Sequence, residues 1–382
     1  MTDGTRRRAF RAIIAFGVVS LLADISYEGA RSILGPFLLT IGASAAVVGL
    51  ISGVGEFVGF ALRVVTGRIA DRTGAYWTMT IGGYVLTVAA VPLLGLVGRV
   101  DLALALVVAE RLGKAVRSPA RDTLIAAASE PLGRGLGFGL HEAIDQMGAV
   151  IGPLLLAWAL AVRSGDYRFA FGILAIPGVL VVVALVALRR IAPVPQRQTA
   201  ALVEQKGRVG RARKYLVFVF LSAVGFAPFP LIAFHLTDRA ILSDAMIPVV
   251  FAVAMAVDAG VALVTGRAYD RRGLGVLLTL PLLSIGILAA FSSTLALIWA
   301  GAMAWGAVMG IQESTLRAAV GDLSDPGGRA TAYGVFNAVY GLALMGGGAA
   351  LGLLYEISIP LMVIFVMVAQ GAATWALRLV AR

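Results

Sequence analysis

The sequence predicts an all-α integral membrane protein whose twelve transmembrane helices form two six-helix bundles. Hydrophobic residues make up 59% of the 382-residue chain and charged residues only 14%, against ~25% charged residues in an average globular domain. The apolar residues fall into runs long enough to cross a bilayer, which takes roughly 20 residues per helix. A short charged motif between two of these runs recurs in the second half of the chain.

Run length and the positions of glycine, proline and charged residues place six spans in each half of the chain. The expected spans are 11–38, 44–66, 76–98, 101–124, 135–162, 168–188, 214–236, 245–265, 274–292, 295–320, 330–353 and 358–379. We therefore expect an N-terminal bundle over 1–188, a cytoplasmic basic linker over 189–213 and a C-terminal bundle over 214–382. The first helix is expected to be retained, although Arg6-Arg7-Arg8 before an apolar run resembles a signal peptide.

Basic residues gather in alternate loops, which predicts the orientation of the chain. Loops rich in Lys and Arg stay in the cytoplasm, so we expect a multi-pass protein of the cytoplasmic (inner) membrane with both termini cytoplasmic. The stretch 189–214 carries eight basic residues and one acidic residue, as a solvated linker or as a segment lying on anionic lipid headgroups. Membrane topology thus explains the net charge of +11, and we expect no nucleic-acid partner.

The repeated motif starts at Gly67 and has the sequence Gly-Arg-Ile-Ala-Asp-Arg-Thr-Gly. Adding 199 to positions 66–74 gives identical residues at Thr265, Gly266, Arg267, Asp270, Arg271 and Gly273. A second, weaker match aligns 134–152 with 329–347 at an offset of 195. The chain is therefore interpreted as a parallel duplication of six spans.

The motif has the composition of a charged hinge. Gly67 and Gly74 permit a tight turn and a close approach of helices, and Asp71 is placed to sit at a helix N-terminus, where its charge opposes the dipole. Arg68 and Arg72 supply cationic partners. The motif is either a topogenic loop or a gate in which charge pairs latch neighbouring helices, and its recurrence favours the gate.

The motif resembles the signature of the major facilitator superfamily, a Gly-x-x-x-Asp-Arg-x-Gly-Arg/Lys loop after the second helix with a degenerate copy after the eighth. The match covers Gly67, Asp71, Arg72 and Gly74, whereas 75–76 lacks the basic tail. The resemblance implies two bundles that rock around a central cavity, with the two loops as cytoplasmic latches. The implied latch residues are Gly67, Asp71, Arg72, Gly74, Gly266, Asp270, Arg271 and Gly273.

A glycine pattern in the fifth span is similar to the antiporter motif of exporters in that superfamily. Gly139 and Gly148 are separated by eight residues and followed by Gly152-Pro153, although Leu156-Ala157 stands where the motif closes with two glycines. Small residues at this spacing also serve ordinary helix packing, and Pro153 removes a backbone hydrogen bond and allows bending. The glycine pattern therefore indicates either an exporter or ordinary helix packing, and we favour the exporter.

Charged residues inside spans are expensive in lipid and are functional candidates by default. Asp24, Glu28 and Arg31 share one face of the first span, and Glu56 lies in the second. The fourth span holds Glu110 and a basic stripe at spacings of three and four, formed by Arg111, Lys114, Arg117 and Arg121, with Asp122 beside it. The fifth span adds His141, Glu142 and Asp145.

These charges are either a fixed ion-pair network or a proton-coupling site. Arg111 matches the arginine that the resembled superfamily associates with proton coupling, although Ala115 replaces the glycine expected four residues later. The positions equivalent to Asp24, Glu28 and Glu56 are Ala223, Ala227 and Met255, which suggests coupling in the first bundle. We assign proton coupling to Asp24, Glu28, Arg111, Glu142 and Asp145.

The resembled fold lines its cavity with the first, fourth, seventh and tenth helices. The expected substrate-cavity residues are Tyr27, Arg31, Glu56, Glu110, Lys114, Arg117, His141, Phe226, Gln312, Glu313, Arg317, Asn337 and Tyr340. Their mixed charge leaves both cationic and anionic substrates open.

Other chemistry finds little support in the sequence. The absence of cysteine and the presence of only two histidines argue against thiol chemistry and histidine-rich metal sites, and neither a phosphate-binding loop nor a nucleophile elbow is present. We expect no enzyme activity, metal or cofactor, and a monomer.

The expected function is secondary active transport of a small organic solute by alternating access, with proton-coupled export (antiport) favoured. Proton-coupled uptake or facilitated diffusion is the alternative. A nontransporting receptor or lipid-handling scaffold is a remote one, because such a protein would gain stability by losing its embedded charges.

Overall fold

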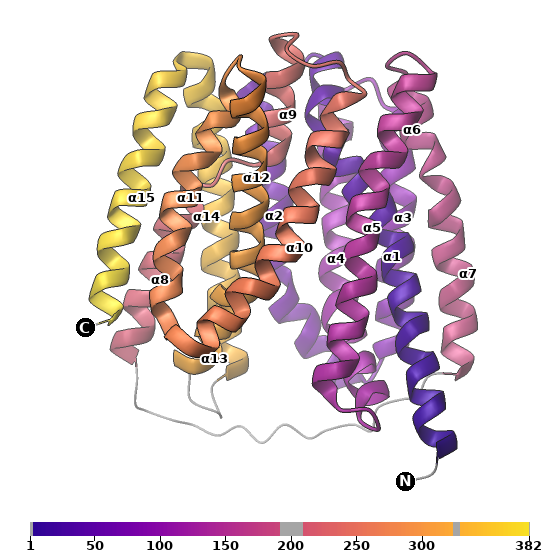
Figure 1. Cartoon of the computed structure of the whole chain (residues 1–382). Coiled ribbons are helices and arrows are strands. Elements are labelled where there is room, and N and C mark those ends of the chain that lie inside the picture. Colours follow the sequence, from indigo (N-terminus) through magenta and orange to yellow (C-terminus); the bar gives the residue numbers. More distant parts are fainter. Residues whose placement is uncertain (1–2, 192–208, 324–328, 382) are drawn as a thin grey trace. The chain divides into compact units, whose positions relative to one another are not determined.

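A computed structural model describes residues 3–191, 209–323 and 329–381, and the regular elements among them are all helical (Figure 1). The first half contains α1 (Asp3–Thr40), α2 (Ala45–Thr73), α3 (Tyr76–Leu93), η1 (Leu94–Leu96), α4 (Val100–Ser129), α5 (Arg134–Val162), α6 (Tyr167–Ile173) and α7 (Ala175–Ile191). These helices coincide with the six spans expected in this half, the sixth being α6 followed by α7.

The second half repeats the pattern with more interruptions. It contains α8 (Val209–Val224), α9 (Phe229–Asp238), α10 (Met246–Arg272), η2 (Gly273–Leu278), α11 (Thr279–Gly286), η3 (Ile287–Phe291), α12 (Leu295–Ile311), η4 (Gln312–Leu316), α13 (Arg317–Leu323), α14 (Arg329–Ile357) and α15 (Ile359–Ala381). The seventh expected span is α8 with α9, and the tenth is α12, the π-helical turn η4 and α13.

Ten stretches of the described chain are long and apolar enough to cross a membrane. Two features account for the difference from twelve. The helix α4 carries too many charged residues to count as an apolar stretch. Residues 246–291 count as one stretch, although the α-helix is interrupted at Gly273. The twelve expected spans therefore all fall on largely helical stretches, in agreement with the predicted all-α membrane fold.

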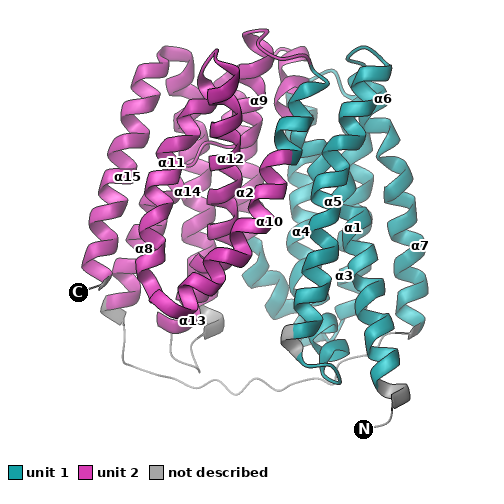
Figure 2. Cartoon of the chain, in the orientation of Figure 1, with its two compact units in different colours: residues 1–33, 62–199, 244–252 teal, residues 34–61, 200–243, 253–382 magenta. Residues whose placement is uncertain are grey.

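The chain forms two compact units (Figure 2). Unit 1 comprises 1–33, 62–199 and 244–252, and unit 2 comprises 34–61, 200–243 and 253–382. Their boundaries fall inside α1, α2 and α10, so each of these helices contributes to both units. Of the expected linker, 192–208 lies outside the described residues, and its flanks form the last turn of α7 and the start of α8.

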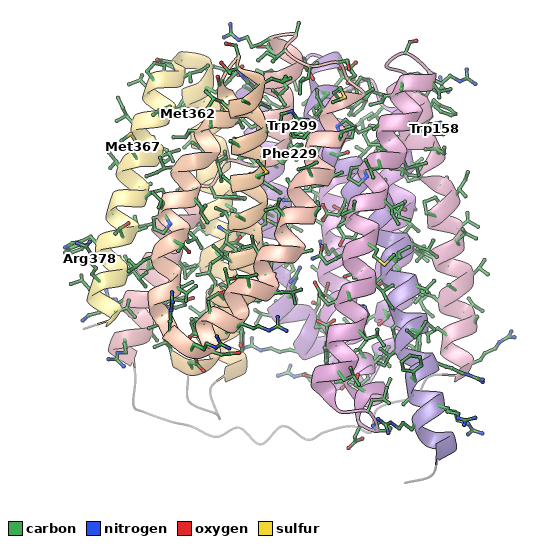
Figure 3. The ribbon with its side chains drawn as sticks, in the orientation of Figure 1. Trp158, Phe229, Trp299, Met362, Met367 and Arg378 are labelled. Atoms are coloured by element: carbon green, nitrogen blue, oxygen red, sulfur yellow. The ribbon has the colours of Figure 1, made fainter. Side chains whose placement is uncertain are left out.

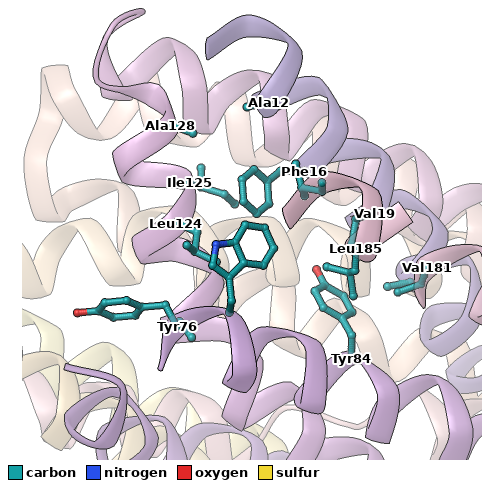
Figure 4. Packing of buried hydrophobic residues seen from close by; sticks show 14 of the residues in the cluster. Ala12, Phe16, Val19, Tyr76, Tyr84, Leu124, Ile125, Ala128, Val181 and Leu185 are labelled. Carbon is teal, nitrogen blue, oxygen red and sulfur yellow. The ribbon is translucent and has the colours of Figure 1, made fainter. Parts of the chain in front are cut away.

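The core of unit 1 is built from apolar faces of α1, α2, α3, α4 and α7 (Figure 4). Phe16 stacks on Trp77 with ring centroids 6.0 Å apart. Leu124 and Ile125 of α4 and Leu185 of α7 are fully buried in the same cluster. This core fixes α4, and Leu124 and Ile125 lie on the same helical face as Arg117 and Arg121 of the charged stripe.

The outward faces of both units are apolar. Trp158 on α5 and Met367 on α15 are about half exposed, and Val368 is exposed to 66% (Figure 3). Soluble monomers rarely expose contiguous apolar surface on this scale. These side chains are the ones expected to face lipid.

The duplication is visible in how the helices pack inside each unit. A Cβ added at Gly152 of α5 would collide with the Ile25 carbonyl of α1, and one added at Gly347 of α14 would collide with the Val224 carbonyl of α8. Gly152 and Gly347 are related by the 195-residue offset, and Ile25 and Val224 by the 199-residue offset. The two halves thus share one helix crossing that only glycine permits.

The two copies of the charged motif also share a local conformation. Gly74 directly follows α2 with φ +67°, and Gly273 directly follows α10 with φ +60°, the left-handed region that favours glycine after a helix. Asp71 lies in the last turn of α2, so the expectation that it sits at a helix N-terminus is wrong for its own helix. The Tyr76 hydroxyl donates to Asp71 at 3.2 Å.

Substitution of Gly152 tests the glycine crossing of α1 and α5. Gly152→Val should lower the apparent melting temperature of the purified protein in detergent, because overpacking of this kind costs about 1–3 kcal/mol. Gly139→Val is the matched control on the same helix, since a Cβ at Gly139 meets no atom within 4 Å. Equal melting temperatures for the two variants would contradict the packing role of Gly152.

Candidate functional site

Charged and polar side chains from α1, α3, α4 and α5 meet inside unit 1. Asp24, Tyr27 and Glu28 of α1 are all buried, as their spacing along one helical face predicts. Arg31, one turn further, pairs with Glu28 at 3.6 Å between Nη1 and Oε2. Buried charges in lipid-embedded helices are tolerated only with partners, and the other helices supply them.

The basic stripe of α4 provides cations to this cluster, but its members differ in how they are satisfied. Arg111 pairs with the adjacent Glu110, with Nε 3.2 Å from Oε2. Arg121 donates through Nη2 and Nε to Oδ1 of Asp122 at 2.9 and 3.0 Å. These two arginines therefore carry their own counter-ions on the same helix.

Lys114 and Arg117 have no such neighbour and lie against aromatic faces instead. The Lys114 ammonium is 4.1 Å from the centroid of the Tyr27 ring, and the Arg117 guanidinium is 5.5 Å from Tyr27 and 4.3 Å from Tyr84. Such cation–π contacts strengthen where water is excluded. Arg117 is only 1% exposed, and its Nε and Nη2 have no hydrogen-bond partner among the described residues.

Glycines hold α3 and α4 close enough for this arrangement. Added Cβ atoms at Gly83 of α3 and Gly113 of α4 would each lie 2.6 Å from the other residue's carbonyl oxygen. A Cβ at Gly83 would also lie 2.7 Å from the Cβ of Arg117. The buried arginine therefore depends on a backbone contact that larger residues would prevent.

A chain of hydrogen bonds runs from α3 through α1 to α5. Ser20 Oγ lies 3.1 Å from the Tyr84 hydroxyl and 2.9 Å from His141 Nε2, and Arg121 Nη1 donates to it at 3.3 Å. Residues 141, 142 and 145 bring ligand atoms within 4.8 Å of one another. Because Ser20 already occupies His141 Nε2, the arrangement is better described as a hydrogen-bond network.

The acidic side chains of α1 and α5 lie close together. Asp24 and Asp145 are within electrostatic reach of each other, and Tyr27 lies beside them. A Cβ at Gly148, three residues after Asp145, would lie 2.8 Å from the Cβ of Asp24, so the glycine allows the two helices to meet here. Glu142, one turn before Gln146, is exposed and accepts a 3.4 Å hydrogen bond from the Gln146 amide.

A second polar group lies in unit 2. The Tyr340 hydroxyl of α14 donates to Oε1 of Gln312 at 2.6 Å, and its ring contacts Phe60 edge-on at 5.0 Å and Phe336 at 5.8 Å. Gln312 begins the π-helical turn η4, a feature frequent at functional sites. Nε2 of Gln312 is buried without a hydrogen-bond partner among the described residues.

The other predicted cavity residues are distributed less tightly. Glu56 and Asn337 are half-buried in unit 2 and thus lie in a different unit from Asp24. Glu313 is exposed in η4, and the Arg317 carbonyl accepts a 3.0 Å hydrogen bond from Tyr333. The structure therefore brings together the first-half residues more closely than those of the second half.

The seventh span is broken at 225–228, which the sequence did not predict. Trp305 Nε1 donates to the Ala227 carbonyl at 2.9 Å and Gln370 Nε2 to the Ser222 carbonyl at 2.9 Å, so side chains satisfy backbone groups that the break frees. Phe226, predicted to line the cavity, is 4% exposed and stacks on Trp305 at 5.5 Å. In this structure Phe226 is a packing residue.

The sequence-based assignment also missed Ser20 and Tyr84. Neither is charged, and Tyr84 lies in a span with no other candidate, so no pattern in the sequence singled them out. Gly83 and Gly113 are visible in the sequence, but their close contact can be inferred only once α3 and α4 are known to be neighbours.

Comparisons with known proteins agree with this architecture. Residues 16–348 match the sequence profile of the Major Facilitator Superfamily. The chain is 47% identical over 369 residues to an uncharacterized protein of Mycobacterium tuberculosis strain H37Rv, covering 94% of this chain and 90% of that protein. It is 26% identical over 364 residues to an uncharacterized MFS-type transporter of Methanocaldococcus jannaschii, covering 92% and 90%.

One relative that matches about half of the chain and two solved structures show further similarity to known transporters. The multidrug resistance protein MdtH of Escherichia coli O1:K1 / APEC is 29% identical over 189 residues, covering 49% of this chain and 45% of MdtH. Among solved structures, a variant of the nucleoside transporter NupG superposes with a TM-score of 0.80 at 12% identity, covering 97% of this chain and all of that one. The peptide transporter POT in complex with sulfate gives 0.76 at 16% identity, covering 100% and 98%.

The low sequence identities to the two solved structures show the fold alone. The family profile, however, matches most of the chain, and the observed helices agree with it. The chain therefore belongs to the Major Facilitator Superfamily of multi-pass membrane transporters.

Proposed function

We propose that the protein exports a small organic solute across the cytoplasmic membrane in exchange for protons, by alternating access between the bundles 1–188 and 214–382. Both termini and the linker 189–213 would lie in the cytoplasm. A proton gradient would supply the driving force.

One observation supports the coupling proposal: Asp24 of α1 and Asp145 of α5 lie within electrostatic reach of each other and of the α4 cations Lys114 and Arg117 inside unit 1. A fixed ion-pair network would pair each carboxylate with a cation, as Arg111 and Arg121 do with theirs. Here two acids lie close to each other, and Nε and Nη2 of the buried Arg117 have no hydrogen-bond partner among the described residues. This arrangement suits a group that gains and loses a proton during the cycle.

Export is proposed over uptake on two grounds. The glycines of α5 follow the spacing of the exporter motif, and about half of the chain is similar to a multidrug resistance protein. Flux measured in vesicles of known orientation decides between the two directions.

We further propose that the substrate contacts Gln312 and Tyr340 in unit 2. Nε2 of Gln312 is buried without a hydrogen-bond partner among the described residues, and it lies beside an aromatic group formed by Tyr340, Phe60 and Phe336, which supports this. Aromatic faces with a few fixed polar groups are typical of small-molecule sites.

Proton coupling is tested by flux in proteoliposomes. A panel of cationic, anionic and neutral compounds is first screened by thermal stability, because a ligand of the folded protein raises its melting temperature. For a compound found this way, the wild type should drive accumulation when a pH gradient is imposed. Asp24→Asn and Glu142→Gln should lose most of that accumulation, because each removes an acid assigned to coupling.

Asp101→Asn is the control, since Asp101 is an exposed acid at the start of α4 paired only with Arg99. It should retain wild-type flux. Flux that ignores the pH gradient, or that is unaffected by both Asp24→Asn and Glu142→Gln, would refute coupling through these acids.

The charged motif after α2 is proposed as a conformational latch that binds neither substrate nor proton. Asp71→Asn should slow exchange between conformations, measured by the kinetics of a spectroscopic label on α2, and should change ligand affinity by no more than a few fold. Asp270→Asn in the second copy serves as the comparison. A wholesale loss of ligand binding in Asp71→Asn would show that the motif is not a latch.

A further inference from the structure

We infer that Gln312 selects solutes that carry an uncharged hydrogen-bond acceptor, such as a carbonyl oxygen or a ring nitrogen, on a flat apolar ring. Tyr340 is the positioning residue that makes Gln312 act as a donor. The inference rests on the proposed contact of the substrate with these two residues and adds the chemical class of the substrate. The contacts around η4 inside unit 2 carry it.

The Gln312 amide is already engaged on its oxygen side. The Tyr340 hydroxyl donates to Oε1 at 2.6 Å, a separation typical of O–H···O bonds and shorter than most N–H···O bonds. The hydroxyl therefore fixes the orientation of the amide, with its oxygen toward α14. Nε2 is buried and has no hydrogen-bond partner among the described residues.

This orientation determines what Gln312 can offer to a ligand. An amide nitrogen donates hydrogen bonds and accepts none, and a buried donor without a partner costs free energy. Gln312 is only 3% exposed, so a hydrogen bond from its nitrogen forms in a low-dielectric environment, where it is stronger than in water. Gln312 therefore favours a ligand atom that accepts over one that donates.

The backbone that carries Gln312 is held at both ends of its turn. The π-helical turn η4 runs from Gln312 to Leu316, and the Tyr215 hydroxyl of α8 donates to the Leu316 carbonyl at 2.7 Å. Ser314 Oγ donates back to the Gly310 carbonyl. The amide is therefore presented from a defined position, as selection between similar ligands requires.

The rings beside the amide set the rest of the ligand. Tyr340 lies edge-on to Phe60 of α2 with ring centroids 5.0 Å apart, and it stacks on Phe336 at 5.8 Å with 9° between the planes. These rings and Gln312 carry no formal charge, so they offer no counter-ion to an ionised ligand group that loses its hydration. Aromatic faces pack well on other flat rings. A neutral acceptor on such a ring matches both parts of the group.

Quinoline and indole test the inference as a matched pair of flat two-ring compounds. At neutral pH the ring nitrogen of quinoline only accepts, whereas the N–H of indole only donates. Affinities are measured by ligand-observed NMR on the purified full chain in detergent and corrected for uptake by protein-free micelles. The wild type should bind quinoline about tenfold more tightly than indole, because indole leaves the buried donor unsatisfied.

Gln312→Leu tests the assignment to the amide, because it keeps a side chain of similar size and removes the donor. The preference for quinoline should disappear in this variant. Equal affinities for the two compounds in the wild type, binding of neither, or a preference that survives Gln312→Leu would each overturn the inference.

Tyr340→Phe tests the positioning role, because it keeps the ring and removes the hydroxyl that fixes the amide. Gln312 can then turn over and present Oε1 to a donor, so indole should bind about threefold more tightly than to the wild type. A purely structural role would weaken both compounds. An indole affinity that does not rise overturns the role of Tyr340.

Tyr355→Phe is the matched control on the same helix. It loses a hydroxyl that lies 2.9 Å from His235 Nδ1, and it is about 22 Å further along α14. This variant should keep the wild-type preference for quinoline, and a change as large as that in Tyr340→Phe would overturn the assignment to Tyr340.

The substrate class and the proposed coupling fail separately. Quinoline should displace a compound found by the thermal screen, and no displacement would overturn the link between this group and the transported solute. A preference for quinoline alongside flux that ignores a pH gradient would leave the acceptor site and refute coupling. Gradient-driven flux of compounds that lack an acceptor would leave coupling and refute the substrate class.

Discussion

The burial of the cationic side chains of α4 restricts which residues can surround them. An arginine such as Arg117, 1% exposed in a helix of a membrane protein, is expensive in lipid and persists only where the surrounding side chains compensate it. Tyr27 and Tyr84 provide aromatic faces, Asp24 and Asp145 provide negative charge, and Gly83 with Gly113 allows α3 and α4 to approach. Each of these elements supplies part of the compensation for the buried charge.

Glycine plays a corresponding role in placing the acids. Gly148 lets α5 approach α1 at Asp24, and Gly152 extends that contact by one turn. The equivalent crossing in unit 2, at Gly347 and Val224, brings no acids together because the residue that corresponds to Asp24 is Ala223. Duplication thus supplied one helix crossing twice, and only the first copy carries charges that can bind a proton.

The sequence predicted the fold well because long apolar runs and a repeated motif are strong signals. Each of the twelve spans falls on a largely helical stretch, and the glycines that end α2 and α10 have the same backbone conformation. The break at 225–228 was missed because its compensation comes from Trp305 and Gln370, which are distant in sequence. The stacking of Phe226 on Trp305 has no sequence signal for the same reason, since the two residues are about 80 residues apart along the chain.

The candidate site was predictable by residue type but not by pairing. Helical spacing placed Asp24, Glu28 and Arg31 on one face, and the basic stripe of α4 indicated that carboxylates would be needed. Which acid meets which cation depends on the side-chain packing between helices, and Ser20 and Tyr84 entered the network without any charge to mark them.

The central claim is that Asp24 and Asp145 bind a proton when the solute is absent and release it when the solute binds. Proton release on ligand binding tests this claim most directly. A compound that raises the melting temperature is added to the purified protein in weakly buffered detergent solution containing a pH dye. The account predicts that binding releases protons in the wild type but not in the Asp24→Asn/Asp145→Asn double variant, and that wild-type affinity weakens as the pH falls. Binding that releases no proton and has the same affinity at every pH would contradict it.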